Sequence, residues 1–179
     1  MNIKFIFIVF AEPYSVFSEI FAKYFSKIKN LKKKVIVFGN IKLIKKQLDK
    51  LNYKIDFNEI TSLKETKINK INIININFKE KKIFSKISKK SNKYIENSFT
   101  KFFELSKQCE NNFVLINGPV SKKTFLNKKY LGITEYLSKK SKSKNELMLI
   151  YNKKLSVSPI TTHLPIKYVS KKINRHKII

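Results

Sequence analysis

The sequence is poor in the residues that build several common kinds of functional site. It has no tryptophan, one cysteine, three glycines and four prolines. The single cysteine, Cys109, excludes an intramolecular disulfide and has no second thiol to complete a metal knuckle, which favours a reducing cytoplasm. The glycines stand at positions 39, 118 and 132, so no Gly-rich phosphate loop is present.

Arginine is nearly absent although the chain is strongly basic. Arg175 is the only arginine among 39 basic residues, which face 12 acidic residues for a net charge of +27. Such a charge is typical of proteins that bind nucleic acid or an anionic surface. Arginine is the residue whose planar fork pairs with phosphates, however, and the scarcity of residues with G+C-rich codons indicates an A+T-rich genome. We expect no specific nucleic-acid partner and no membrane, and keep a basic module for RNA or a membrane surface as the alternative.

Apolar content is high enough for a buried core. Hydrophobic residues make up 42% of 179 residues and include 15 phenylalanines, which argues against intrinsic disorder. The apolar run from Phe5 to Ala11 could be taken for the core of a signal peptide. It is too short to span a bilayer and has no small-residue cleavage site, so we interpret it as a buried first strand.

Strand-like and helix-like segments alternate along the chain. This alternation predicts an α/β fold with a parallel sheet, in a single domain over residues 1–179. Expected strands lie at 4–10, 34–38, 71–78 and 112–117, and expected helices at 15–28, 41–51 and 91–109. A hairpin over 146–160 and a last helix over 165–173 follow.

The helical spacing also predicts which faces are buried. The first helix should bury Val16, Ile20, Tyr24 and Ile28, with Ser15 available as its cap. The second and third helices should bury Ile41, Ile44, Leu48 and Leu51, and Ile95, Phe99, Phe102, Phe103 and Leu105. We expect residues 58–69 to form a polar loop, and residues 79–90, rich in Lys and Ser, to form a solvated connection.

Taken alone, the residues that could perform catalysis are few. The chain has two histidines, His163 and His176. A single histidine followed by Leu-Pro is more often structural than a ligand, and His176 lies in a basic tail.

Four short segments, in this order, are more informative. They are Glu12-Pro13 with the residues to Glu19, Asn117-Gly118-Pro119 with Lys122, Gly132-Ile133-Thr134-Glu135, and Thr161-Thr162-His163-Leu164-Pro165. The series resembles the 4-hydroxythreonine-4-phosphate dehydrogenase family, which has Gly-Glu/Asp-Pro-Ala-Gly-Ile-Gly-Pro-Glu, Thr-Gly-Pro-x-x-Lys, Gly-His-Thr-Glu and Thr-Thr-His-x-Pro. The resemblance runs from about Ile3 to Ile173 and covers the N-terminal half of a family member.

The resemblance implies both a fold and an activity. The fold would be the N-terminal portion of the isocitrate and isopropylmalate dehydrogenase-like α/β/α sandwich, a mixed sheet with helices on both faces. The activity would be oxidation of 4-phosphohydroxy-L-threonine by NAD or NADP, with decarboxylation, in the biosynthesis of pyridoxal phosphate (vitamin B6). The resemblance also implies a homodimer and a divalent metal held by three histidines, for which zinc, magnesium or cobalt is expected.

The same resemblance assigns roles to three residues. His163 matches the first metal-binding histidine, and neutral imidazole is a suitable zinc ligand. Thr134 matches a threonine whose hydroxyl contacts the substrate. Lys122 matches the lysine of the Gly-Pro turn, where an ammonium group could meet the charge of the substrate and is a possible catalytic group.

The departures from the family pattern affect the site directly. Ile133 replaces a histidine that contacts the substrate, Phe17 replaces a glycine and should block close backbone approach, and Asn117 replaces a threonine. The family's other two metal-binding histidines and its cofactor residues lie in a second half. His176 is no substitute, because about 13 residues of helix would place it about 20 Å from His163. We expect the chain to be inactive unless a second polypeptide supplies that half; the remaining reading is a non-functional fragment.

Overall fold

The computed structural model describes residues 3–28, 30–79, 82–110, 112–143, 146–161 and 164–175. The chain divides into two compact units, residues 1–128 and residues 129–179, which we call unit 1 and unit 2.

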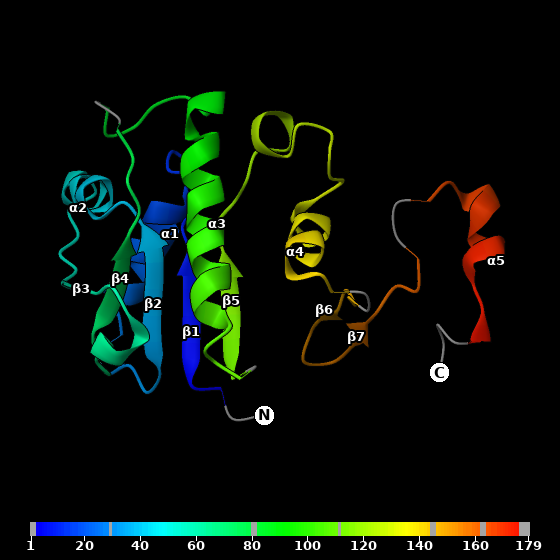
Figure 1. Ribbon diagram of the computed structural model, residues 1–179, viewed down its shortest axis with the longest axis horizontal. Helices are drawn as coiled ribbons and strands as arrows, with labels where there is room; N and C mark the ends of the chain where they lie inside the picture. The colour runs from blue at the N-terminus through cyan, green and yellow to red at the C-terminus, as the bar shows by residue number, and fades with distance from the viewer. Residues whose placement is uncertain are drawn as a thin grey trace. The chain divides into compact units, whose positions relative to one another are not determined.

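Unit 1 is built around a five-stranded sheet. Its strands are β1 (Phe5–Val9), β2 (Lys34–Gly39), β3 (Phe57–Glu59), β4 (Ile71–Asn75) and β5 (Phe113–Asn117). They lie in the order β3-β4-β2-β1-β5, and every pairing within this sheet is parallel (Figure 1). A mixed sheet also contains antiparallel pairing. Among the described residues, antiparallel pairing is found in a second sheet, the two-stranded sheet of unit 2. The first apolar run is a buried strand, as predicted, and it pairs on both sides.

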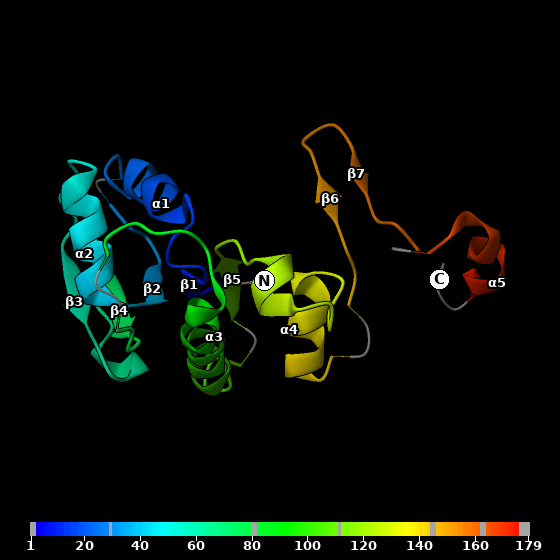
Figure 2. The same ribbon diagram turned by 90° about the horizontal axis from the view of Figure 1, so that it is seen from above.

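Helices cover both faces of this sheet. They are α1 (Phe17–Phe25), α2 (Ile41–Lys50) and α3 (Asn92–Ser106). Ile8 and Val37 pack with residues of α1 and α2 on one face. On the other face, Phe102 of α3 meets the rings of Phe7 and Phe38 edge-on. Figure 2 shows α1 and α3 on opposite sides of the strands, which confirms the α/β fold with helices on both faces.

The predicted faces of α2 and α3 are confirmed, although Leu51 and Phe103 are only half-buried, but the predicted face of α1 is wrong. Val16, Ile20 and Tyr24 are 57%, 53% and 62% exposed. The helix instead packs through a neighbouring stripe that includes Phe21 and Phe25, which contact each other at 4.5 Å between ring centroids. The two stripes are both apolar and are offset by one residue, so helical periodicity alone cannot choose between them.

The predicted loop at 58–69 contains regular structure. Phe57 to Glu59 form β3, which pairs with β4, and a 3-10 turn, η1, covers Leu63–Glu65. Asn58 donates a hydrogen bond to the buried Asn72 side chain at 2.9 Å, so a polar residue holds this edge of the sheet. The polar composition misled the prediction because an edge strand accepts polar side chains.

Unit 2 contains short elements. They are α4 (Ile133–Ser141), the antiparallel strands β6 (Ile150–Tyr151) and β7 (Ser156–Val157), a 3-10 turn η4 (Ile166–Tyr168) and α5 (Val169–Lys172). The hairpin and the last helical segment are therefore present where predicted, with shorter strands. Within the described residues, no helix is long and apolar enough to cross a membrane.

Candidate functional site

The sheet topology singles out the carboxyl ends of β1 and β5. The chain leaves β1 through α1 toward β2 on one side, and reaches β5 from β4 through α3 on the other side of β1. In parallel α/β sheets, ligands bind in the crevice outside such a change of direction. The Glu12-Pro13 turn follows β1, and the Gly118-Pro119 turn follows β5. Two of the four family segments thus meet at one place in unit 1.

Main-chain hydrogen bonds join these two turns. The Glu12 amide donates to the Pro119 carbonyl at 3.1 Å, and the Gly118 amide donates to the Val9 carbonyl at 2.7 Å. Ala11 lies between them, fully buried, with a φ of 54°. A left-handed conformation is unfavourable for alanine, and such backbone strain concentrates at functional sites.

Gly118 is required by the chain's own backbone. A Cβ atom at this position would lie 2.4 Å from the Phe10 carbonyl oxygen and 3.0 Å from Cδ1 of Phe17. Its φ is not positive, so the close approach, and not a left-handed turn, excludes a larger residue. The Phe17 ring also packs against Phe10 at 5.3 Å between centroids. Phe17 therefore fills the space beside the Gly118 turn.

Glu12 is a buried carboxyl at these two turns. Its side chain is 2% exposed; Oε1 accepts hydrogen bonds from the Ser91 hydroxyl at 3.0 Å and from the Tyr14 amide at 3.4 Å. Oε2 has no hydrogen-bond partner among the described residues. Burial raises the pKa of Glu12 above its ordinary value, and the two hydrogen bonds oppose that rise. A protonated Glu12 could donate a hydrogen bond, because its free oxygen then carries the proton.

Lys122 begins a short helical turn just beyond Gly118-Pro119. The turn η3 (Lys122–Leu126) is π-helical, and the Ser121 hydroxyl caps it by accepting from the Thr124 amide at 3.1 Å. The Asn92 side chain of α3 donates a hydrogen bond to the Thr124 carbonyl at 2.9 Å and so holds the turn against α3. Lys122 itself is exposed to solvent. Single π-helical turns are rare in proteins, and those that occur are often found at functional sites.

The remaining predicted site residues belong to unit 2. Thr134 is exposed in the first turn of α4, and Ile133, the first residue of that helix, is half-buried. His163 lies outside the described residues, as does His176. Among the residues that the structure describes, no group of three or more His, Cys, Asp or Glu side chains could hold a metal ion. The structure therefore brings Glu12, Gly118 and Lys122 into one unit, while the metal assignment stays a prediction.

Sequence reasoning missed two residues at the start of α3 that hold the two turns: Ser91, which precedes the helix, and Asn92, its first residue. Ser91 contacts Glu12 across 79 positions of sequence, and Asn92 reaches Thr124 across 32. Serine and asparagine are common in this chain, and no local pattern marks these two. Only the tertiary structure brings Ser91 into contact with Glu12 and Asn92 into contact with Thr124.

Comparisons with known proteins identify the family of the chain. The family model described as "Pyridoxal phosphate biosynthetic protein PdxA" matches residues 31–179. The 4-hydroxythreonine-4-phosphate dehydrogenase of Sulfurihydrogenibium sp. (strain YO3AOP1) is 29% identical over 178 residues, which span 96% of this chain and 53% of the relative. The enzyme of the same name from Aquifex aeolicus (strain VF5) is 40% identical over 50 residues, 28% of this chain and 16% of the relative.

Solved structures show the same fold. A putative 4-hydroxythreonine-4-phosphate dehydrogenase from Salmonella typhimurium superposes with a TM-score of 0.81 at 18% identity, covering 98% of this chain and 56% of that one. The corresponding protein from Burkholderia phymatum gives a TM-score of 0.79 at 18% identity, over 99% and 56% of the two chains. The chain thus spans about half the length of the relatives that it matches along its whole length. On the match over residues 31–179, the chain belongs to the PdxA family of pyridoxal phosphate biosynthetic proteins.

Proposed function

We propose that this chain provides the substrate side of a 4-hydroxythreonine-4-phosphate dehydrogenase of pyridoxal phosphate biosynthesis. One observation carries the proposal: the Glu12-Pro13 and Gly118-Pro119 turns are hydrogen-bonded to each other at the carboxyl ends of adjacent parallel strands. The exposed Lys122 follows directly. A crevice at this point of a parallel sheet is a general location for a small ligand.

Three residues receive roles in this proposal. The Lys122 ammonium group attracts the charge of the phosphorylated substrate, and the Thr134 hydroxyl hydrogen-bonds to the substrate. His163 is a ligand of a divalent metal, which would polarise the reacting hydroxyl when bound. Ile133 can neither titrate nor hydrogen-bond, so it contributes only apolar contact.

The described residues do not form a metal site by themselves. They contain no cluster of three suitable ligands, and a single imidazole would bind a divalent ion weakly because affinity depends on the number of ligands. Oxidation by NAD or NADP likewise needs a binding surface to which we assign no described residue.

The proposal also needs the other half of a family member, in the same polypeptide or in a second one. Since this chain spans 53% of the Sulfurihydrogenibium relative, the other half of that relative is the natural source of further metal ligands and of a cofactor surface. We propose a cytoplasmic homodimer for the complete assembly.

Complementation tests this proposal. The purified chain is assayed with 4-phosphohydroxy-L-threonine, NAD or NADP, and zinc, magnesium or cobalt, alone and with a polypeptide of the second half of the relative. We expect turnover only in the mixture. Turnover by the chain alone would overturn the need for a partner, and no turnover in a mixture that forms a complex would overturn the proposed activity.

Variants of η3 test the role of Lys122. In the active mixture, Lys122→Ala should raise the KM for the phosphorylated substrate, because a charge contact is lost. Lys123→Ala is the matched control, since Lys123 is exposed in the same turn. Equal effects of the two substitutions would show that only the overall positive charge matters.

A further inference from the structure

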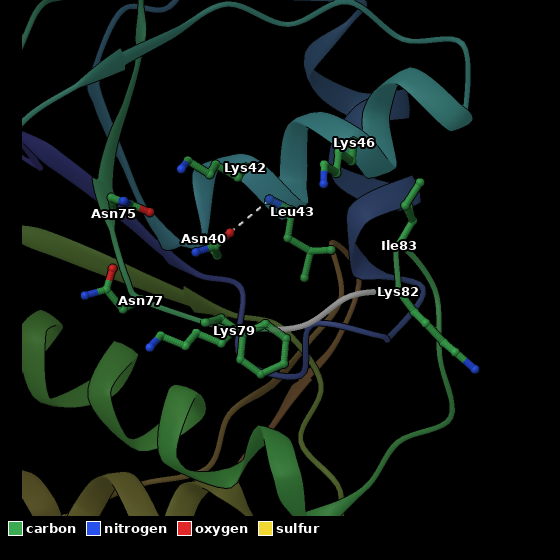
Figure 3. Close-up of a pocket in the computed structure, with 10 residues that line it drawn as sticks. Asn40, Lys42, Leu43, Lys46, Asn75, Asn77, Lys79, Lys82 and Ile83 are labelled. Atoms are coloured by element: carbon green, nitrogen blue, oxygen red, sulfur yellow. Dashed lines mark hydrogen bonds between the residues drawn. The ribbon is translucent and has the colours of Figure 1, made fainter.

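A second concave site in unit 1 lies at the carboxyl ends of β2 and β4. It is a cavity of about 410 Å³, a volume typical of small-molecule sites, and it lies between α2 and the segment that follows β4 (Figure 3). Lys42 and Lys46 line it from α2, and Asn77, Phe78 and Lys79 line it from the opposite side. Lys122 and the Gly118 turn are not among its lining residues, so it is separate from the site proposed above.

Positive charge is concentrated around this cavity. Lys42, Lys46, Lys79 and Lys82 line it, and its described lining residues include no carboxylate. The ion pairs formed by the described residues lie elsewhere, on α1 and α3. Lys42 and Lys46 are four residues apart on one helix, where like charges repel each other. Figure 3 shows both extending from α2 and Lys79 from the facing wall, while Lys82 points away from the opening.

The polar rim of the cavity is held in place by the fold. Asn40 accepts a hydrogen bond from the Leu43 amide at 2.9 Å, drawn in Figure 3, and donates to the Ile76 carbonyl at 2.9 Å. The Asn75 side chain accepts from the Ile41 amide at 3.2 Å. The first turn of α2 is thus capped by side chains of the chain itself. An incoming anion would therefore be bound by the lysine ammonium groups, because the Ile41 and Leu43 amides already donate to these side chains.

An apolar wall completes the site. Phe78 and Leu43 both line the cavity, and the Phe78 ring packs against Tyr94 at 4.8 Å between centroids. Tyr94 in turn is fixed by the hydrogen bond that its hydroxyl accepts from the Asn40 amide at 3.0 Å. A rigid aromatic wall opposite ammonium groups matches a ligand that has both an organic part and a phosphate.

We propose that this cavity binds a small organic phosphate. The phosphate contacts Lys42, Lys46 and Lys79, and the organic part lies against Phe78. A nucleic acid is the less suitable ligand, because its phosphates would be attracted by lysines over the whole surface of a chain with a net charge of +27. Occupation of the cavity would also relieve the repulsion between the three ammonium groups.

Calorimetric titration with phenyl phosphate at physiological salt tests the proposal. We expect binding to the full chain, and K42A/K46A should weaken it about tenfold or more, because two charge-assisted contacts are lost. The control K45A/K50A removes the same charge from exposed positions of α2 that do not line the cavity. Absence of binding, or an equal loss in both variants, would overturn the proposal.

Further probes distinguish the ligand class. Phenol should not bind, and inorganic phosphate should bind more weakly than phenyl phosphate, because each lacks one half of the contacts. Binding of a single-stranded RNA oligonucleotide should be weakened equally by K42A/K46A and K45A/K50A. A loss of RNA binding in K42A/K46A alone would overturn the choice of a small ligand.

Far-ultraviolet circular dichroism checks that both variants fold. Shifts of the Asn40 and Asn75 side-chain amide signals in the NMR spectrum on adding phenyl phosphate locate the site in the unmodified chain. This outcome is independent of dehydrogenase activity.

Discussion

The two units differ in where their apolar side chains lie. In unit 1, Phe7 and Phe38 have no exposed surface, and they belong to strands that are covered on both faces. In unit 2, Tyr136 is the only buried apolar residue among those described. Leu147 and Ile166 are 83% and 90% exposed. Unit 1 therefore has a core of its own, whereas unit 2 exposes the side chains that would have to form one.

This difference indicates where the stability of the chain resides. Burial of apolar surface is the main favourable contribution to folding, and an isolated two-stranded hairpin is marginal in water. Unit 1 should thus account for nearly all of the free energy of unfolding. Of the residues proposed to contact the substrate, Lys122 belongs to unit 1 and Thr134 to unit 2.

The largest effect is expected at Phe7. Its ring contacts four other phenylalanines at 5.4 to 5.9 Å between centroids. Phe7→Ala should lower the free energy of unfolding by about 3 to 5 kcal/mol, measured by urea denaturation followed by far-ultraviolet circular dichroism. Phe84→Ala, at a position 46% exposed, is the control and should cost far less. Equal losses would mean that the sheet interior is not the main source of stability.

A smaller decrease in the free energy of unfolding is expected when Gly118 is replaced. Gly118→Ala places a methyl group 2.4 Å from the Phe10 carbonyl oxygen and should cost about 1 to 3 kcal/mol, the range for overpacking. Gly132→Ala is the matched control from unit 2, because its nearest neighbour would be the movable Glu135 carboxylate at 3.0 Å. A neutral Gly118→Ala in the same urea experiment would show that the two turns are not in close contact.

Glu12 should make the stability of unit 1 depend on pH. Its pKa is raised by burial, so the folded state holds the proton more tightly than the unfolded state. The stabilisation from the protonated form is full below the ordinary pKa of about 4.5 and is lost as the pH rises through the raised pKa. Glu12→Gln keeps the neutral form at all pH values. The free energy of unfolding of the natural chain should fall relative to this variant above pH 4.5, and parallel pH profiles would contradict the assignment.

The smallest effect is expected in the hairpin of unit 2. Leu155 is 68% exposed, and Leu155→Ser should change the free energy of unfolding by less than about 0.5 kcal/mol. The measurement is repeated at several protein concentrations. A decrease in the free energy of unfolding of more than about 2 kcal/mol that disappears on dilution would show that the Leu155 side chain is buried between copies of the chain. The difference in burial between the two units would then hold only for the single chain.

The sequence allowed the segments of unit 1 to be predicted because their patterns are local. The apolar runs of β1 and β2 and the helical spacing of α2 and α3 each lie within a few turns of chain, where side-chain period follows directly from backbone geometry. The order of the family segments likewise needed only the sequence. The choice of buried face on α1 was wrong because Ile20 and Phe21 lie on adjacent stripes that are equally apolar.

The site was predictable only in part. The Gly-Pro pair correctly marked a turn at a strand end, but what approaches Gly118 is the carbonyl of Phe10, the residue directly after β1. The support of Glu12 by Ser91 joins residues 79 positions apart, and the cavity joins α2 to the segment after β4. Such contacts depend on which strands become neighbours, which local patterns do not encode.

The sequence by itself determined the fold class, the run of strands and helices, and the family, because these follow from short-range periodicity and from motifs in a fixed order. Only the tertiary structure decided which stripe of α1 is buried, which backbone makes Gly118 necessary, and which of the many lysines face one cavity. The reason is physical: parallel pairing brings distant strand ends to one edge of the sheet, and the burial and charge found there belong to the assembled layers and not to any single segment.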